Sequence, residues 1–212
     1  MPRGLMLLLV RHFLEIGDLE AAVITATSFE QLLRTASELV DVSLQDVTWP
    51  GSVSAWTGSD KGSVKLSNTK TRSLDSFMLR MDDTDVLSTT LLLHWFDLRV
   101  GQGATPDSRL FTYRPNQYRA AFHRGLIALG LPETHPYYPH SMRAGGAVWL
   151  EEIGMSIDGI RRRGRWDRIQ TTELYLCRGR AMLGISTSLP PSLEPAARHL
   201  MKYPLSLLSF IL

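Results

Sequence analysis

The sequence predicts a mostly helical α+β fold, in which a small antiparallel sheet lies between helical segments. Three observations lead to this prediction. Residues 4–46 have apolar residues at the spacing expected of helices. Residues 47–80 contain short runs in which small or polar residues mix with apolar ones, as in strands. Apolar residues at helical spacing return after residue 85. The chain of 212 residues is long enough for one domain with a sizeable core, or for one domain plus a tail.

The first helical segment contains a capping pattern. Ser28, with Gln31 three residues later, fits the capping box and predicts a helix that begins at this point. Its apolar face would come from Leu32, Leu33, Leu39 and Val42.

The middle segment predicts two or three antiparallel strands. Residues 52–56 and 63–66 alternate clearly between small or polar residues and apolar ones. Residues 76–79 are a third candidate strand. Turn-forming residues separate them, at Pro50-Gly51, Gly58-Ser59-Asp60 and Asn68-Thr69.

Helices return in the second half. Asp82-Asp83-Thr84 is a good capping cluster for a helix whose apolar residues run from Val86 to Phe96. Asn116 would cap the next helix, which Gly130 would end.

A proline-rich connector before residue 140 delivers His140 to the start of a helix over 141–153. Two short helices, 156–163 and 167–177, follow around a break at Gly164. We therefore expect a compact domain over residues 1–180, with residues 181–212 as a tail. For this tail a packing helix, a partner-docking segment and an irregular or non-native extension all remain open.

Composition limits the classes of protein. The net charge of +2 supports nucleic-acid binding only weakly, but arginine outnumbers lysine and seven arginines fall within 161–180. Taken alone, that cluster is as consistent with a solvated helix face as with a phosphate-binding surface. The single cysteine, Cys177, excludes an internal disulfide framework and a cysteine-rich zinc site. The apolar run at 4–10 is too short to span a membrane.

The last third of the chain carries an ordered set of residues suited to phosphodiester chemistry. His140 and Arg143 would share one face at a helix start, where backbone amides and the helix dipole also favour an anion. Gly145-Gly146 would lower helix propensity there unless another backbone packs closely. Trp166 can donate from its indole nitrogen, and Tyr175, nine positions later, supplies a phenol that can attack phosphorus. Each residue alone has an ordinary structural interpretation, so the order and spacing carry the prediction.

This set resembles the signature of the tyrosine recombinases (the phage-integrase family). His140-Ser-Met-Arg143-Ala-Gly-Gly-Ala is similar to the family's second box, Gly164-Arg165-Trp166 to its next motif, and Thr171–Tyr175 to the segment that ends in the nucleophile. Lys70, in Leu66–Thr71, resembles the family's mobile lysine. The residues of these motifs look most similar to those of recombinases from DIRS-like and crypton-like eukaryotic mobile elements. The resemblance covers roughly residues 15–180.

The resemblance implies an integrase-like catalytic domain that cuts and rejoins DNA through a 3′-phosphotyrosyl intermediate at Tyr175. His140, Arg143, Trp166 and Arg34 would stabilise the transition state, and Lys70 would protonate the leaving 5′ oxygen. It implies double-stranded DNA as partner, a homotetramer on DNA, and neither metal nor cofactor. The short apolar runs predict no membrane association. The location would be nuclear in a eukaryote and cytoplasmic otherwise.

The first box departs from the family pattern. Arg34 stands four residues before Glu38-Leu39, where the family has three, and one residue turns a helical side chain by about 100°. The N-terminal DNA-clamping half of the family is also not evident in this sequence. A DNA-binding remnant without catalysis is therefore the main alternative, and a nicking enzyme similar to type IB topoisomerases is a third possibility.

Overall fold

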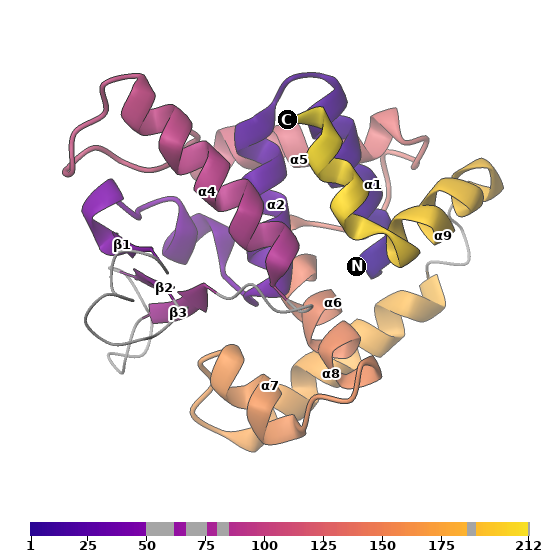
Figure 1. The fold of residues 1–212 in the computed structure, drawn as a ribbon. Coiled ribbons are helices and arrows are strands. Elements are labelled where there is room, and N and C mark those ends of the chain that lie inside the picture. The colour runs from indigo at the N-terminus through magenta and orange to yellow at the C-terminus, as the bar shows by residue number, and fades with distance from the viewer. Residues whose placement is uncertain (50–61, 67–75, 80–84, 186–189, 212) are drawn as a thin grey trace.

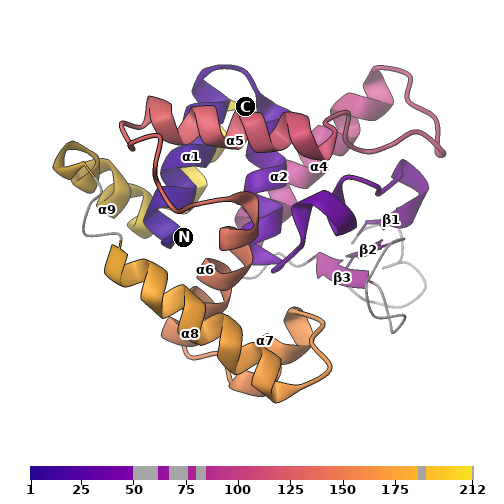
Figure 2. The same ribbon diagram turned by 180° about the vertical axis from the view of Figure 1, so that it is seen from behind.

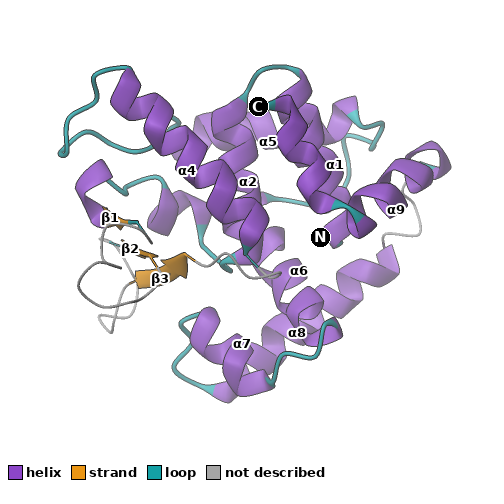
Figure 3. Cartoon of the chain, viewed as in Figure 1, coloured by secondary structure: helices purple, strands orange, loops and turns teal. Residues whose placement is uncertain are grey.

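The computed structural model describes residues 1–49, 62–66, 76–79, 85–185 and 190–211. Over these ranges the chain is mostly helical, with a small antiparallel sheet at one side (Figure 3). The mostly helical α+β fold class is thereby confirmed.

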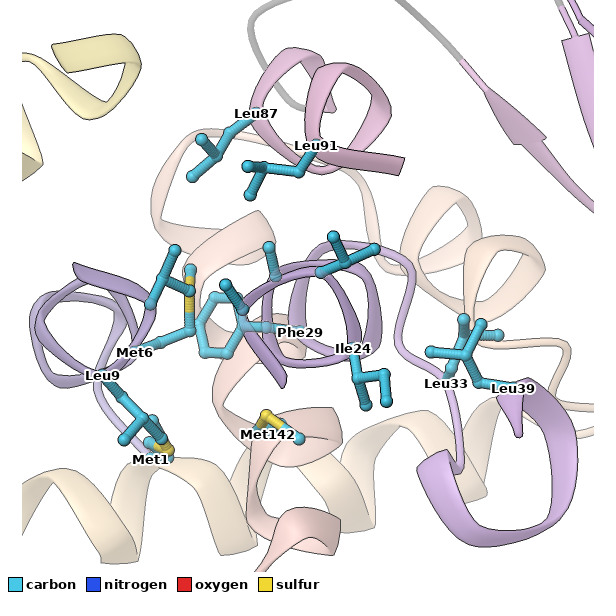
Figure 4. Packing of buried hydrophobic residues seen from close by; sticks show 14 of the residues in the cluster. Met1, Met6, Leu9, Ile24, Phe29, Leu33, Leu39, Leu87, Leu91 and Met142 are labelled. Atoms are coloured by element: carbon cyan, nitrogen blue, oxygen red, sulfur yellow. The ribbon is translucent and has the colours of Figure 1, made fainter. Parts of the chain in front are cut away.

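Helix α2 (Leu19–Glu30) forms the centre of the core. It packs against α1 (Arg3–Glu15), α4 (Val86–Gly101) and α6 (Pro139–Glu152). Figure 4 shows Phe29 of α2 pointing between these helices, with Met6, Leu91 and Met142 around it. Every residue of α2 from Glu20 to Glu30 is buried, as expected of a central helix that packs on all sides.

The helix predicted to begin at Ser28 and to run through Leu32 and Val42 is not formed. Helix α2 begins at Leu19 and ends at Glu30, and Leu32 then has a φ of 52°. Gly17 adopts a positive φ of 75°, and Asp18 then caps α2 by accepting a hydrogen bond of 3.1 Å from the backbone N–H of Ala21. Ser28 lies in the last turn of α2, where its hydroxyl is hydrogen-bonded to that of Thr35 at 2.8 Å. The prediction was wrong because Asp18, directly after Gly17, is the stronger start signal.

The sheet has the order β1-β2-β3 and all its pairs are antiparallel. Its strands are β1 (Val47–Thr48), β2 (Gly62–Lys65) and β3 (Ser76–Leu79). The second and third predicted strands are confirmed to within one residue. The predicted strand over 52–56 lies outside the described residues, and β1 directly follows the short 3-10 turn η2 (Leu44–Asp46).

Helix α5 (Pro115–Ala128) begins one residue before the predicted cap at Asn116. Arg114 occupies the N-cap, Pro115 the first helical position, and the backbone N–H of Arg114 donates to the side chain of Gln117 at 2.9 Å. Pro115 is favoured there because its fixed φ suits the first turn. The helix ends before Gly130, whose φ of 85° fits the predicted stop.

Helices α6, α7 (Ile157–Arg163) and α8 (Ile169–Ile185) form the lower part of Figure 1. The first two match their predicted ranges closely, whereas α8 extends eight residues beyond the predicted end at 177. Glycines allow the close approach of α6 to α2 and of α8 to α6. A Cβ on Gly146 would lie 2.2 Å from the carbonyl oxygen of Phe29, and one on Gly179 2.5 Å from that of Ala144. The expectation that another backbone packs on the Gly145-Gly146 pair is confirmed.

Residues 190–211 fold back onto α1 as η4 (Pro191–Leu193), α9 (Glu194–Lys202) and η5 (Pro204–Phe210). Figures 1 and 2 show α9 and η5 beside α1 from both sides. Leu200 and Leu207 are buried in this contact. Among the described helices, none combines the length and apolar character needed to cross a membrane.

Candidate functional site

The fold brings Tyr175 and His140 into contact, although they are 35 residues apart. Tyr175 lies in α8 and is 9% exposed, and His140 lies in the first turn of α6, where it is exposed. The phenolic Oη lies 3.2 Å from His140 Nε2, within hydrogen-bonding distance. The packing of α8 on α6, which Gly179 allows, sets this distance.

An aromatic and cationic stack lies behind the phenol. The Trp166 ring is parallel to that of Tyr175 within 15°, with centroids 4.6 Å apart. The guanidinium carbon of Arg143 lies 5.0 Å from the Trp166 centroid and 5.6 Å from the Tyr175 centroid. Trp166 is buried, and its Nε1 has no hydrogen-bond partner among the described residues. The stack therefore holds Tyr175 in place and leaves one indole donor unused.

Arg143 is buried and largely engaged. Its Nη1 donates to the carbonyl oxygen of Leu32 at 2.7 Å and reaches Glu38 at 3.3 Å, and its Nη2 donates to the carbonyl oxygen of Gly164. Burial lowers the pKa of Arg143 to about 10, against the opposing effect of Glu38, and Arg165 and Arg34 lower it further. Arg143 remains charged at neutral pH, so a positive charge lies next to the phenol.

Glu38 is the common acceptor of three arginines. Besides Arg143, its carboxylate receives Arg34 at 2.8 Å and Arg165 at 3.3 Å. Glu38 is 2% exposed, and a buried carboxylate requires such partners. In the sequence Glu38 served only to mark spacing, and this role was missed. Nothing in the local sequence marked Glu38, because two of its three partners, Arg143 and Arg165, lie more than 100 residues away along the chain.

Arg165 reaches Glu38 from an unusual backbone conformation. Its φ is 54°, in the left-handed region, and its side chain also donates to the carbonyl oxygens of Leu32 and Arg163. The left-handed turn directs the Arg165 side chain back toward the end of α2 and delivers Trp166 beneath Tyr175.

A π-helical turn lies between Arg34 and the residues after Glu38. The turn η1 (Thr35–Leu39) follows Arg34 directly, and the N–H of Val40 donates to the carbonyl oxygen of Thr35, five residues earlier, at 3.4 Å. A π turn accommodates one more residue than an α turn. Arg34 consequently contacts the same carboxylate, that of Glu38, as Arg143 does.

Arg34 and His140 line one hollow of about 360 Å³, together with residues of α5. The Arg34 side chain is 29% exposed, so it is accessible from this hollow. Desolvation lowers the pKa of His140, and the charges of Arg143, Arg34 and Arg178 lower it further. The imidazole is therefore neutral at neutral pH and is able to accept a proton from the phenol.

Five of the six predicted site residues converge in this region: Arg34, His140, Arg143, Trp166 and Tyr175. The sixth, Lys70, lies outside the described residues. Within the described ranges, no three His, Cys, Asp or Glu side chains form a group that would hold a metal ion.

Six of the seven arginines of 161–180 fall into two groups, and the seventh, Arg161, is partly buried and bonds Asp158 and the carbonyl oxygen of Trp166. Arg162, Arg168, Arg178 and Arg180 are exposed. Arg163 and Arg165 instead point inward, where the Arg163 Nε donates to the carbonyl oxygen of Glu30 at 2.8 Å. The cluster is thus only partly a solvated face.

The chain matches no protein-family model, and no curated protein matches it.

Proposed function

We propose that this protein cleaves and rejoins DNA strands through a covalent phosphotyrosyl intermediate on Tyr175, as a catalytic domain of the tyrosine-recombinase type. The observation that carries the proposal is the 3.2 Å contact between Tyr175 Oη and His140 Nε2 beside the charged Arg143. A nucleophile, a base within hydrogen-bonding reach and a cation are the three parts that activation of a phenol needs.

The proton of the phenol has an acceptor in this arrangement. Because the pKa of His140 is lowered, its ring is neutral near pH 7, and its Nε2 accepts the Tyr175 proton when Nδ1 carries the ring hydrogen. The phenolate that results lies near the Arg143 guanidinium, which stabilises its charge.

Attack on the phosphodiester then follows a balanced course. Tyr175 Oη forms a bond to phosphorus, the bond from phosphorus to the 5′ oxygen breaks, and that oxygen takes up a proton. By resemblance to the family, Lys70 supplies this proton. Attack by the 5′ hydroxyl of a DNA strand on the phosphotyrosyl bond reverses these steps and rejoins DNA without an energy source.

Arg34 and Trp166 would contact the phosphate oxygens. Arg34 is accessible from the hollow that it shares with His140, and guanidinium groups bind phosphate by paired hydrogen bonds. The Trp166 Nε1 is a buried donor with no partner in the described structure, which is the state expected of a donor that a substrate oxygen would satisfy. Double-stranded DNA and assembly into a tetramer belong to this proposal through the family resemblance.

One observation favours a second candidate, a DNA-binding remnant without catalysis. Both Nη groups of Arg143 are engaged by backbone carbonyls and Glu38, so a phosphate would gain this cation only by displacing them. In that case the protein would bind DNA with an affinity that falls with salt, and would form no adduct.

A suicide-substrate assay separates the two candidates. Nicked duplexes would be taken from the DNA that flanks the mobile element expected to encode the protein. They would be incubated with wild type, with Tyr175→Phe and with the control Tyr203→Phe. The control changes an exposed tyrosine of the tail. The proposal expects a protein–DNA band that survives denaturation in wild type and in Tyr203→Phe but not in Tyr175→Phe. Salt-sensitive binding without any such band would favour the remnant.

A further inference from the structure

Three hollows meet at one exposed side chain, Tyr138. The first, of about 360 Å³, is the hollow of Arg34 and His140. A second, of about 350 Å³, lies between α5 and the connector before α6, and a third, of about 300 Å³, contains His140 and Tyr175. Tyr138 lines all three hollows and is 62% exposed, which makes it the most exposed large apolar or aromatic side chain of the described structure.

The backbone of Tyr138 is fixed in place. Its N–H donates to the hydroxyl of Ser141 at 3.0 Å, and its carbonyl oxygen accepts from the N–H of Ser141 at 2.8 Å. Pro139 follows and restricts the conformation of Tyr138 further. The ring is therefore held out on a rigid stem two residues before His140. A ring exposed at this position is accessible to a ligand that enters any of the three hollows.

The second hollow combines flat rings with hydrogen-bonding groups. Phe122, His123, Tyr137 and Tyr138 provide the rings, and Asn116 and Arg119 provide an amide and a guanidinium. Arg119 also lines the first hollow, so it connects the second hollow with His140. Of the described residues that line the three hollows, none is a carboxylate. Aromatic surfaces beside cations, without anions, suit a planar base attached to a phosphate.

We propose that this second hollow, defined by Asn116, Arg119, Phe122, His123, Tyr137 and Tyr138, binds one unstacked nucleobase of the DNA strand held at Tyr175. The inference rests on the proposed function, which it deepens by naming the form of the substrate. A base stacks on Tyr138 and enters the hollow, while the adjoining phosphate lies toward Arg119 and His140. A paired base cannot do this, so the preferred substrate has an unpaired or easily unstacked nucleotide beside the scissile phosphate.

Binding of short fluorescent oligonucleotides tests the proposal without requiring cleavage. One probe is single-stranded and the other is the matched duplex, and their dissociation constants are measured at fixed salt. We expect Tyr138→Ala to weaken single-strand binding by about fivefold to about 150-fold, the range for loss of one stacked base, and to change duplex binding little. Tyr138→Trp should retain single-strand binding, since indole also stacks. Tyr203→Ala, which removes a tyrosine that lines none of the three hollows, is the matched control.

A second variant tests the hollow itself. Ala120 lies on the exposed side of α5 and lines the second hollow, so Ala120→Trp would fill it. Ala128→Trp adds the same side chain to the exposed end of α5, away from the hollows. The proposal expects Ala120→Trp, but not Ala128→Trp, to weaken single-strand binding.

Three results would overturn the proposal: equal losses on single strand and duplex, no loss in Tyr138→Ala, or competition by a free deoxynucleoside monophosphate as strong as by the oligonucleotide. The last result would identify the hollow as a small-molecule site instead. Failure of the proposed cleavage would show in a different assay, as the absence of a covalent protein–DNA adduct in wild type. The comparison of single-strand with duplex binding would still be interpretable in that case.

Discussion

Glu38 and Arg143 form an ion pair of 3.3 Å in the interior of the protein, with both side chains at least 98% buried. Glu38 follows α2, and Arg143 lies in α6, so this pair connects two segments that are 105 residues apart. Arg34 and Arg165 complete the cluster on the same carboxylate. One carboxylate among three guanidinium groups leaves an excess of positive charge next to Tyr175, which is the charge that an attacked phosphate needs.

Substitution of Glu38 should therefore be severe. Glu38→Gln leaves Arg143 buried without its counter-charge, and we expect a loss of about 3–5 kcal/mol in the free energy of unfolding, measured by urea denaturation. Glu15→Gln is the control, because Glu15 pairs with Arg11 on the exposed face of α1. There the loss should be about 1 kcal/mol or less. Similar effects of the two variants would contradict the structural role of Glu38.

The close approach of α6 to α2 depends on Gly146. A Cβ there would meet the carbonyl oxygen of Phe29 at 2.2 Å, so Gly146→Ala forces the helices apart and should cost about 1–3 kcal/mol. Gly101, at the end of α4, has no neighbour within 4 Å of such a Cβ. Gly101→Ala should be neutral or stabilising by about 0.4–1 kcal/mol. Thermal denaturation of both variants measures the contrast, and a tolerated Gly146→Ala would show that the packing is looser than described.

Arg34 should matter for cleavage more than for stability. Arg34→Ala removes an accessible guanidinium beside His140, and we expect the rate of adduct formation to fall about 10²- to 10³-fold. Glu38 keeps two other partners, so unfolding should change by about 1 kcal/mol or less. Arg109→Ala, which removes an exposed arginine paired with Asp41, is the control for non-specific loss of charge. Unchanged adduct formation in Arg34→Ala would exclude a role for Arg34 at the phosphate.

The ionisation of His140 is open to direct measurement. Its pKa should lie below the ordinary value of 6.5, because desolvation and three arginines disfavour the imidazolium. The unfolded chain then binds more protons than the native one in the window below that value, so His140 contributes stability above pH 6.5 that is lost as pH falls through its native pKa. In an NMR titration, Arg178→Gln should raise this pKa by removing one of the three charges. A His140 that titrates above 6.5 would argue against its role as proton acceptor.

The features that could be predicted from the sequence are those set by neighbouring residues, such as helix ends and close helix contacts at glycine. The Gly145-Gly146 pair indicated a close backbone contact, and the proline-rich connector before His140 predicted the start of α6. The sequence could not reveal that Glu38 gathers three arginines, because that contact joins segments more than 100 residues apart. The sequence also could not show how the spacing of four residues between Arg34 and Glu38 is accommodated. An extra residue produces a π turn only when other contacts, here the Arg34–Glu38 pair, favour it. Tyr138 drew no attention because a tyrosine before a proline has no local signature.

The most direct test of the account is to locate the covalent bond. After trapping with a suicide substrate, nuclease digestion would leave a nucleotide remnant on the protein, and peptide mass spectrometry would identify the residue that carries it. We expect a remnant on Tyr175, in the peptide after Arg168, in wild type and in Tyr138→Phe alike. A remnant on Tyr138 or on any other residue, or a DNA-bound protein that carries no remnant, would contradict the assignment of Tyr175 as the nucleophile.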